Sequence, residues 1–487
     1  MRKWKMLLLI CLQGSFLPFA FSQEKWDLRR CVDYALANNI SVKQTDIQSR
    51  LAAVDYKQNK WSQYPNVDFS TSTGLGFGRS IDPNTNTYIS ETAMLLSQNF
   101  GLSAGVTVFN WHRIRNNIMA TRFAADAGNM DVAKVKNDIA LNVATFYLQI
   151  LLARQQVNIA KVQMAQTREQ IGFARKKVDA GASPELDVLT LEGQYATDSS
   201  NYISAVATAD QNLLDLKAVL NFDPGAAFDI AEPPVEQIPL EPLLDLQPEN
   251  VFREGVSNMP AQKANALRIQ AQEYNVKAAK GAFYPTISVG AGLNTQFGMS
   301  NKYALPQLTG RDVPTGTYWK NGTDTIPVVS PGYILQSQTR SFSKLWDGWG
   351  TLINDNFRQN IGVSISVPIN NGGQARFNQQ RAKLNLENAK LTRDQSDLTL
   401  KTEIYKAYNS ASAALEKWNA TKASVSLTQR TYDFASKRFE LGLLNSFDLI
   451  TSQNNLTRAK LDQAAAQFDY VFKMKVLEFY KGQGIKL

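Results

Sequence analysis

Apolar residues recur at heptad spacing in a long stretch that follows Pro368 and contains no proline. Its main line consists of Ile404, Ala411, Trp418, Val425, Tyr432 and Phe439. Mostly small residues form a second line three positions further on, which is typical of a helix packed closely against a partner helix. Gly442 is the only glycine between Gly373 and Gly482, so we predict two helices and one turn. The first, residues 374–441, would be about 100 Å long.

An earlier stretch, residues 111–180, carries the same two lines, shifted by 261 positions. Its main line consists of Val143, Ile150, Val157, Met164, Ile171 and Val178. The turn repeats as well, because residues 181–187 match residues 442–448 with glycine first and aspartate last. We therefore predict an internal two-fold repeat. Each half contains an opening helix (residues 26–60 and 251–280), two strands, a long helix, a turn and a returning helix.

Between the helices, apolar residues alternate with glycine, serine and threonine at a period of two. This pattern predicts β-hairpins at residues 67–109 and 286–369, the second with a long loop at 298–356. Each strand has about 11 residues, and about 9–11 residues cross an outer membrane when tilted. A half-buried strand of a soluble protein also alternates. Aromatic residues at the strand ends, including Trp61 and Trp111, predict an interfacial girdle, with core packing as the alternative.

The remaining segments define the domain boundaries. Residues 1–22 have the basic start, apolar core and small-x-small end of a secretory signal peptide. Residues 23–221 form the first repeat and residues 250–487 the second. Residues 222–249 contain six prolines and are predicted to be an extended connector. Without the signal peptide, Cys31 is the only cysteine, and we expect a buried apolar residue there.

Charge and composition exclude several classes of function. The formal net charge is +9 and falls to +6 without the three signal-peptide cations, and the chain has no basic run. Nucleic-acid binding therefore has little support. The only histidine, His112, lies near a predicted strand–helix junction, and no metal-ligand cluster, nucleotide loop or nucleophile elbow occurs. We expect no enzyme activity, no metal and no cofactor.

The strand count has a physical consequence. Four membrane strands cannot close a barrel, and an open edge in lipid leaves backbone groups without hydrogen bonds. The strands must therefore be shared between chains. Two chains give eight strands, a barrel filled by its own side chains, whereas three give twelve and an open lumen. The long helices would continue the wall away from the membrane, as a pore joined to a tube.

The opening motif Trp-x-Leu-x-x-Cys-x-x-Tyr-Ala-Leu-x-Asn-Asn spans residues 26–39. Together with the duplicated plan and the two Gly-x5-Asp turns, it resembles the TolC family of outer-membrane efflux proteins over essentially the whole mature chain. The resemblance implies a mainly α-helical homotrimer. Its twelve-stranded outer-membrane β-barrel would lie in outer-membrane lipid and continue as a long periplasmic α-helical barrel. The connector at residues 222–249 would form an equatorial belt.

The function that this resemblance implies is an outer-membrane export duct of a multi-component efflux or secretion system. It would take substrates from a periplasmic adaptor (a membrane fusion protein) and an inner-membrane transporter. The long loop at 298–356 would face outside the cell. The alternative is a secreted or surface coiled-coil or adhesion protein, which does not need four glycine-rich strands of membrane length. A passive porin, in turn, has no use for such long helices.

Family members close the tube at its periplasmic tip, where an acidic ring narrows the entrance. The resemblance places this ring at Asp448, but Thr451 stands where members can carry another aspartate. Members can also carry a hydroxylated aromatic and a basic residue on either side of Gly442. Here these residues are Phe439 and Leu444. We expect them to close the constriction by apolar contact, and three copies of Asp448 to attract cations.

Gly181 and Asp187 are the matching positions in the first tip turn. The simpler interpretation of Asp187 and Asp448 is a carboxylate that favours a helix N-terminus. Ser183 or Asn445 can cap the returning helix of its half.

Overall fold

The computed structural model describes residues 25–81, 86, 88–235 and 238–482, so the predicted signal peptide at residues 1–22 lies outside the described residues. The chain divides into two compact units. Among the described residues, the helical unit consists of residues 25–56, 120–235, 238–273 and 383–482. The strand unit consists of residues 57–81, 86, 88–119 and 274–382.

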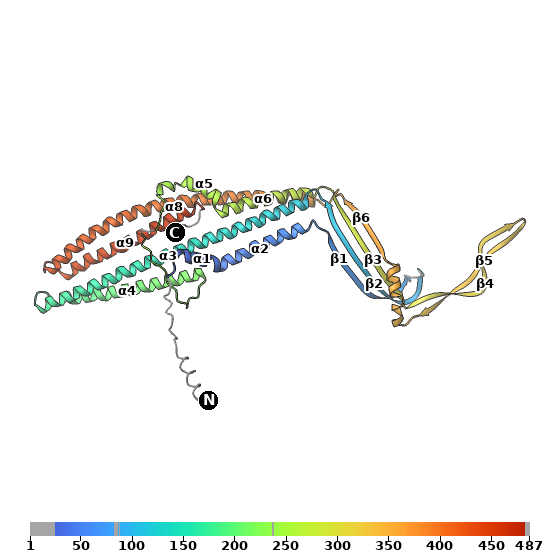
Figure 1. Cartoon of the computed structure of the whole chain (residues 1–487), viewed down its shortest axis with the longest axis horizontal. Helices are drawn as coiled ribbons and strands as arrows, with labels where there is room; N and C mark the ends of the chain where they lie inside the picture. The colour runs from blue at the N-terminus through green and yellow to red at the C-terminus, as the bar shows by residue number, and fades with distance from the viewer. Residues whose placement is uncertain (1–24, 82–85, 87, 236–237, 483–487) are drawn as a thin grey trace, which may run out of the picture. The chain divides into compact units, whose positions relative to one another are not determined.

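Most of the chain is helical (Figure 1). The helices outside the strand region are α1 (Leu28–Asn38), α2 (Ile40–Trp61), α3 (Arg113–Asp179), α4 (Glu185–Leu220), η2 (Leu243–Asp245), α5 (Pro248–Asn258), α6 (Pro260–Gly281), α8 (Gln374–Glu440) and α9 (Ser446–Phe479). The two long helices are confirmed, and α3 and α8 have 67 residues each. The shorter helices also match in length, because α1 and α5 have 11 residues and α2 and α6 have 22.

The prediction of one continuous opening helix in each half is wrong, because each is broken in two. Asn39 separates α1 from α2 with an extended backbone, and its side-chain oxygen accepts a hydrogen bond from the Ser41 backbone N–H at 2.9 Å. In the second half the break falls at Met259, whose ψ is 130°. Pro260 follows, and a residue before proline is disfavoured in the helical conformation.

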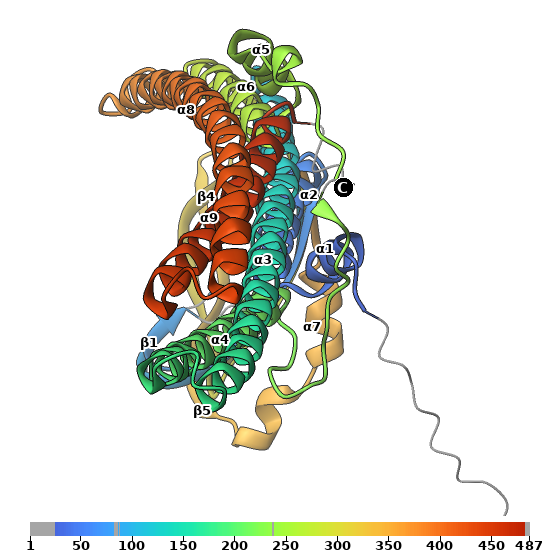
Figure 2. The ribbon, with the colours of Figure 1, turned by 90° about the vertical axis from the view of Figure 1, so that its left-hand side faces the viewer.

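Two helical hairpins, α3–α4 and α8–α9, lie side by side in the helical unit (Figure 2). The main apolar core lies where α1, α3, α4, α9 and the connector meet. Its most deeply buried residues are Cys31, Ala35, Val143, Ile150, Leu216, Leu220 and Ile230. The connector joins this core through Ile230, which pairs with Trp26 in a parallel bridge. Burial of Cys31 is thus confirmed, and it raises the pKa of the thiol to about 12.

The strand unit contains a four-stranded antiparallel sheet in the order β1-β2-β3-β6. Its strands are β1 (Asn66–Ile81), β2 (Tyr88–Phe109), β3 (Thr286–Ser300) and β6 (Arg358–Ser366). The register places apolar residues opposite apolar residues and small polar residues opposite small polar residues, as the alternation predicts. Phe69 lies opposite Leu102, and Leu102 opposite Leu293. One face is therefore apolar, and the other carries mainly glycine, serine and asparagine.

Two predictions about the strands need correction. The strands have 16, 22, 15 and 9 residues, so the first three exceed the predicted length. The last strand ends at Ser366, before Pro368, which has no N–H for the ladder.

The segment expected as a loop at residues 298–356 is mostly structured. It contains β4 (Lys302–Asn321), β5 (Asp324–Thr339), η3 (Phe342–Trp346) and α7 (Trp349–Asp355). The sequence predicted a loop here because both strands contain prolines, which usually indicate loops.

Within the part of the chain that the structure covers, no helix combines the length and the apolar character that a membrane span requires. Among the same residues, no group of three or more histidine, cysteine, aspartate or glutamate side chains is placed to hold a metal ion. His112 lies at the junction between β2 and α3, as expected, with a left-handed backbone conformation (φ 61°).

Candidate functional site

The two tip turns have the same backbone geometry. Gly181 and Gly442 follow the ends of α3 and α8 with φ of 70° and 75°, a region that favours glycine. In the first turn, the Gly181 N–H donates to the Val178 carbonyl at 2.9 Å. In the second, the Gly442 N–H donates to the Phe439 carbonyl at 3.0 Å. Each glycine therefore ends a long helix and reverses the chain.

Asp187 connects the two tip turns. It lies in the first turn of α4, and its Oδ1 accepts hydrogen bonds from the Ser446 hydroxyl at 2.6 Å and the Ser446 N–H at 3.3 Å. Its Oδ2 accepts from the Ser183 hydroxyl at 2.5 Å. Ser183 therefore does not cap α4 as predicted, because its hydroxyl donates to this carboxylate. Asn445 does cap α9, since its Oδ1 accepts from the Asp448 N–H at 2.8 Å.

The environment of Asp187 favours its ionised form. Partial burial would raise the pKa of the carboxyl group. The hydrogen bonds from Ser183 and Ser446, together with the charge of Lys177, hold this pKa below its usual value of 3.8. Asp187 is therefore a carboxylate at neutral pH, when it accepts from both serines.

Lys177 forms a second connection between the hairpins. Its ammonium group donates to the Phe439 carbonyl at 2.6 Å. The same group lies 4.8 Å from the ring centre of Phe173 and 5.1 Å from that of Phe439. A cation in this position is attracted to both rings. The one sequence signal at Lys177 is its position in the last turn of α3, where a lysine often satisfies free carbonyls.

An apolar cluster lies between these two connections. Its buried members are Ala174, Val188, Leu191, Phe439, Leu449 and Ile450. Phe439 is only 5% exposed, so its side chain packs inside the chain's own tip. Leu444 lies half-buried at the edge of the cluster. Closure of a shared entrance by these two residues stays a prediction.

Asp448 has a different environment from Asp187. It is exposed in the first turn of α9, and its carboxylate has no hydrogen-bond or ion-pair partner among the described residues. The simpler interpretation, a carboxylate near a helix N-terminus, fits this position. A ring of three copies stays a prediction as well.

A buried polar layer crosses three helices further along the hairpins. Asp198 of α4 is 3% exposed and accepts from the Thr167 hydroxyl of α3 at 2.6 Å. Thr167 in turn accepts from the Gln453 amide of α9 at 3.2 Å. Thr167 lies three positions after Met164, on the line of mostly small residues, and its hydroxyl is the one sequence signal of a polar contact there.

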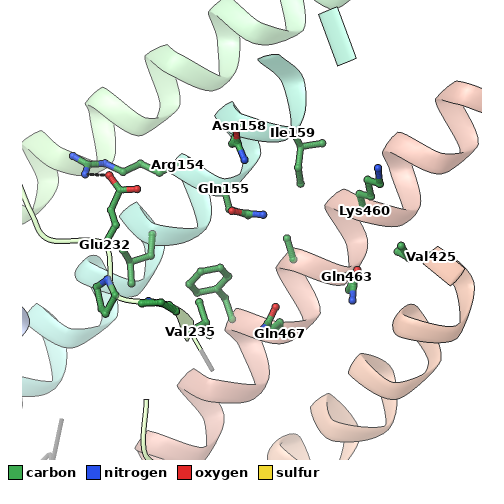
Figure 3. A pocket seen from close by; sticks show the side chains of 15 residues that line it. Arg154, Gln155, Asn158, Ile159, Glu232, Val235, Val425, Lys460, Gln463 and Gln467 are labelled. Atoms are coloured by element: carbon green, nitrogen blue, oxygen red, sulfur yellow. Dashed lines mark hydrogen bonds and ion pairs between the residues drawn. The ribbon is translucent and has the colours of Figure 1, made fainter. Parts of the chain in front are cut away.

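A polar pocket of about 660 Å³ lies between the connector, α3 and α9 (Figure 3). Arg154 of α3 forms ion pairs with Asp229 and Glu232 of the connector. It also donates to the Ile230 carbonyl at 3.2 Å. Lys460 and several amide side chains form the far wall. These contacts fasten the connector to the first long helix.

In the strand unit, aromatic side chains gather where the strands meet the helices. Trp111 stacks on Tyr284 with ring centres 4.2 Å apart, and Trp61 lies 5.3 Å from Tyr64. All of these except Tyr284 are exposed in the single chain. The interfacial girdle stays a prediction, with core packing as its alternative.

A second aromatic group covers the apolar face near the opposite ends of β2 and β3. Phe297 and Leu345 are buried there, and Trp346 stacks on Phe297 at 5.9 Å. The Trp349 indole N–H donates to the Gln98 side-chain oxygen at 2.7 Å. Segments η3 and α7 thus hold two partly exposed tryptophans against the sheet.

Comparison with known proteins identifies the class. The family described as "Outer membrane efflux protein" matches residues 31–221 and 320–479. The chain is 21% identical over 371 residues to the outer membrane efflux protein BepC of Brucella suis, covering 76% of this chain and 69% of BepC. It is 22% identical over 410 residues to the outer membrane protein TolC of Escherichia coli, covering 79% and 74%.

The fold agrees with a solved structure. A crystal structure of CusC, reported in connection with transmembrane channel formation, matches with a TM-score of 0.73 at 16% identity. The match covers 95% of this chain and 93% of that one. The chain belongs to the outer membrane efflux protein family, which confirms the resemblance inferred from the opening motif and the duplicated plan. The protein is accordingly located in the outer membrane, with its helical part in the periplasm.

Proposed function

We propose that three copies of this chain form an outer-membrane export duct. Their strand units would share one twelve-stranded β-barrel, and their helical units would continue it as a periplasmic α-helical barrel. The observation that carries the proposal is the four-stranded sheet, whose outer strands β1 and β6 each pair on one side among the described strands. Edges of this kind are unstable in lipid unless another chain pairs with them.

The exposed apolar face of the sheet supports a position in the membrane. Phe69 is 66% exposed in the single chain and Ile361 is 81% exposed. Side chains of this kind are stable when they face lipid. The aromatic groups near opposite ends of the strands fit the two interfacial girdles of an outer-membrane barrel. The opposite face, with Ser70 and Gly101, would then line the lumen.

The matched lengths of the helices in the two halves support the proposed internal repeat. Duplication would let three chains supply twelve long helices to one tube. Such a tube would receive substrate from a periplasmic adaptor and an inner-membrane transporter, because a passive pore does not need it.

The tip would act as the entrance gate. Asp187 and Ser446 join the α3–α4 hairpin to the α8–α9 hairpin, and Lys177 joins them again through Phe439. Opening by movement of one hairpin would break both connections. Asp448, exposed at the same tip, would contribute one carboxylate from each chain to the entrance.

The topology can be tested with protease sites in intact cells. A site inserted near Thr315, in β4, should be cut by external protease. A site near Leu443, at the second tip, should be cut only after the outer membrane is permeabilised. Both residues are exposed, so accessibility does not differ within the chain itself. Protection of the first site and cleavage of the second in intact cells would contradict the proposal.

A further inference from the structure

The β4–β5 hairpin is a two-stranded ribbon separate from the main sheet (Figure 1). Its strands contain 20 and 16 residues, and β4 carries extra residues at two bulges. Almost every side chain along both strands is exposed. A single hairpin is at best marginally stable in water, so a ribbon of this length needs a partner.

Both faces of the ribbon are apolar. Strand β5 alternates regularly, and the pairing assigns the residues of β4 to the same two faces. We call face A the side that carries Leu308, Tyr318, Val329, Tyr333 and Leu335. Face B is the side that carries Leu305, Val313, Trp319, Ile326, Val328 and Ile334.

The apolar area is large for a surface that faces water. From their exposed fractions, the side chains of each face expose on the order of 600 Å². This is at or above the largest apolar patch of a typical monomer, about 300–600 Å². It approaches the roughly 800 Å² per partner of a standard protein interface. Two such faces therefore point to two contacts, one on each side of the ribbon.

A ribbon can also find a partner by pairing its edges with a further strand, and its prolines disfavour this. Pro306 and Pro314 lie in β4, and Pro327 and Pro331 lie in β5. Proline has no N–H to donate, so in a strand it occupies positions where that side of the backbone faces outward. Each outer edge therefore lacks a donor at two positions, which disfavours the addition of a further strand. Burial must come from the faces.

We infer that the partner of each hairpin is the same hairpin of the neighbouring copy, with face A of one chain against face B of the next. This inference rests on the proposed trimer. A cyclic trimer uses two different surfaces of each chain, one toward each neighbour. A two-fold pair would bury one face and leave the other exposed. Three hairpins joined in this way form a ring that narrows the external mouth of the duct.

Cysteine crosslinking tests the ring. Tyr333 and Ile334 are adjacent residues on opposite faces, 64% and 59% exposed, so cysteines there should be equally accessible. Three variants are compared after mild oxidation of outer membranes: Tyr333→Cys, Ile334→Cys and the double variant. Cys31 can stay, because it is buried and a thiol with a pKa of about 12 is unreactive at neutral pH.

The expected result is a covalent ladder of two and three chains for the double variant and only single chains for each single variant. A dimer from Tyr333→Cys alone would show face A against face A and would overturn the ring. To distinguish failure of the ring from failure of the trimer, crosslinking between β1 and β6 of neighbouring chains is measured in parallel. If that crosslink forms but the hairpin ladder does not, the ring is wrong and the trimer stands. If neither forms, both proposals are wrong.

Discussion

Substitution of Asp187 by alanine tests the connection between the tip turns. The change removes both hydrogen bonds from Ser446, at 2.6 and 3.3 Å, and the one from Ser183. Glu185→Gln is the matched control. Glu185 is an exposed carboxylate in the same first turn of α4, so its loss weakens only the interaction with the helix dipole.

Hydrogen bonds to a charged group contribute about 1.5–3 kcal/mol when buried. Asp187 is half-buried at an open tip, where water weakens such interactions, so we expect about 1–2 kcal/mol for the whole connection. That free energy corresponds to roughly a 5–30-fold increase in the population of tips that are locally open. The helix-dipole effect removed by the control is smaller, about 0.3–1 kcal/mol.

Hydrogen exchange followed by mass spectrometry measures this population directly, because the Ser446 amide is itself a donor to Asp187. Peptides that cover 180–187 and 441–448 should exchange roughly 5–30-fold faster in Asp187→Ala. Peptides from the connector should not change. Equal exchange in Asp187→Ala and Glu185→Gln would refute the connection.

The stabilisation of the tip by Asp187 depends on pH in a definite direction. The pKa of Asp187 is lowered from 3.8 in the folded chain, so its contribution is complete above that value. It is lost as the pH falls through the folded pKa. Tip exchange in the wild type should therefore approach that of the variant only in acid below about pH 3.8.

Two further substitutions address the gate. Phe439→Ala should destabilise the tip by about 3–5 kcal/mol and raise resting conductance in planar bilayers, since Phe439 is buried in the tip cluster. Phe434→Ala, on the exposed side of the same helix, should change neither, and equal conductance in the two variants would contradict a role in closure. Asp448→Asn should weaken the block of single-channel current by divalent cations and leave the trimer intact. Asp210→Asn, an exposed carboxylate far along α4, should leave that block unchanged, and an unaltered block in Asp448→Asn would favour the helix-terminus interpretation.

The long helices and the sheet could be predicted because their signals are long and regular. A heptad line of six positions cannot be confused with a strand, and a glycine marked each turn. The short breaks could not be predicted with the same ease. Met259 precedes a proline, which favours a helix break there but does not require one. Asn39 ends α1, and its side-chain oxygen accepts a hydrogen bond from the Ser41 N–H. Many asparagines lie within helices, so the residue type alone does not predict a break.

The tip site was predictable in position and less so in its contacts. Asp187 was selected through the repeat, but its partner Ser446 lies 259 residues away in sequence. Lys177 lies in the last turn of α3, where a lysine often satisfies carbonyls of its own helix. Here it donates to a carbonyl of α8, and no pattern identifies that partner because every residue has a carbonyl. The β4–β5 hairpin was missed because prolines usually indicate a loop. Here they occupy the edges of a ribbon, a position that depends on the pairing.

The central claim, that three chains share one barrel, is tested most directly at the free edges of the sheet. A cysteine at Thr71, in the middle of β1, is combined in turn with cysteines at positions 359–364 of β6, and isolated outer membranes are oxidised. At the correct register, the account predicts a covalent ladder that ends at three chains. A ladder that ends at two chains, or no crosslink between chains at any of these positions, would contradict it.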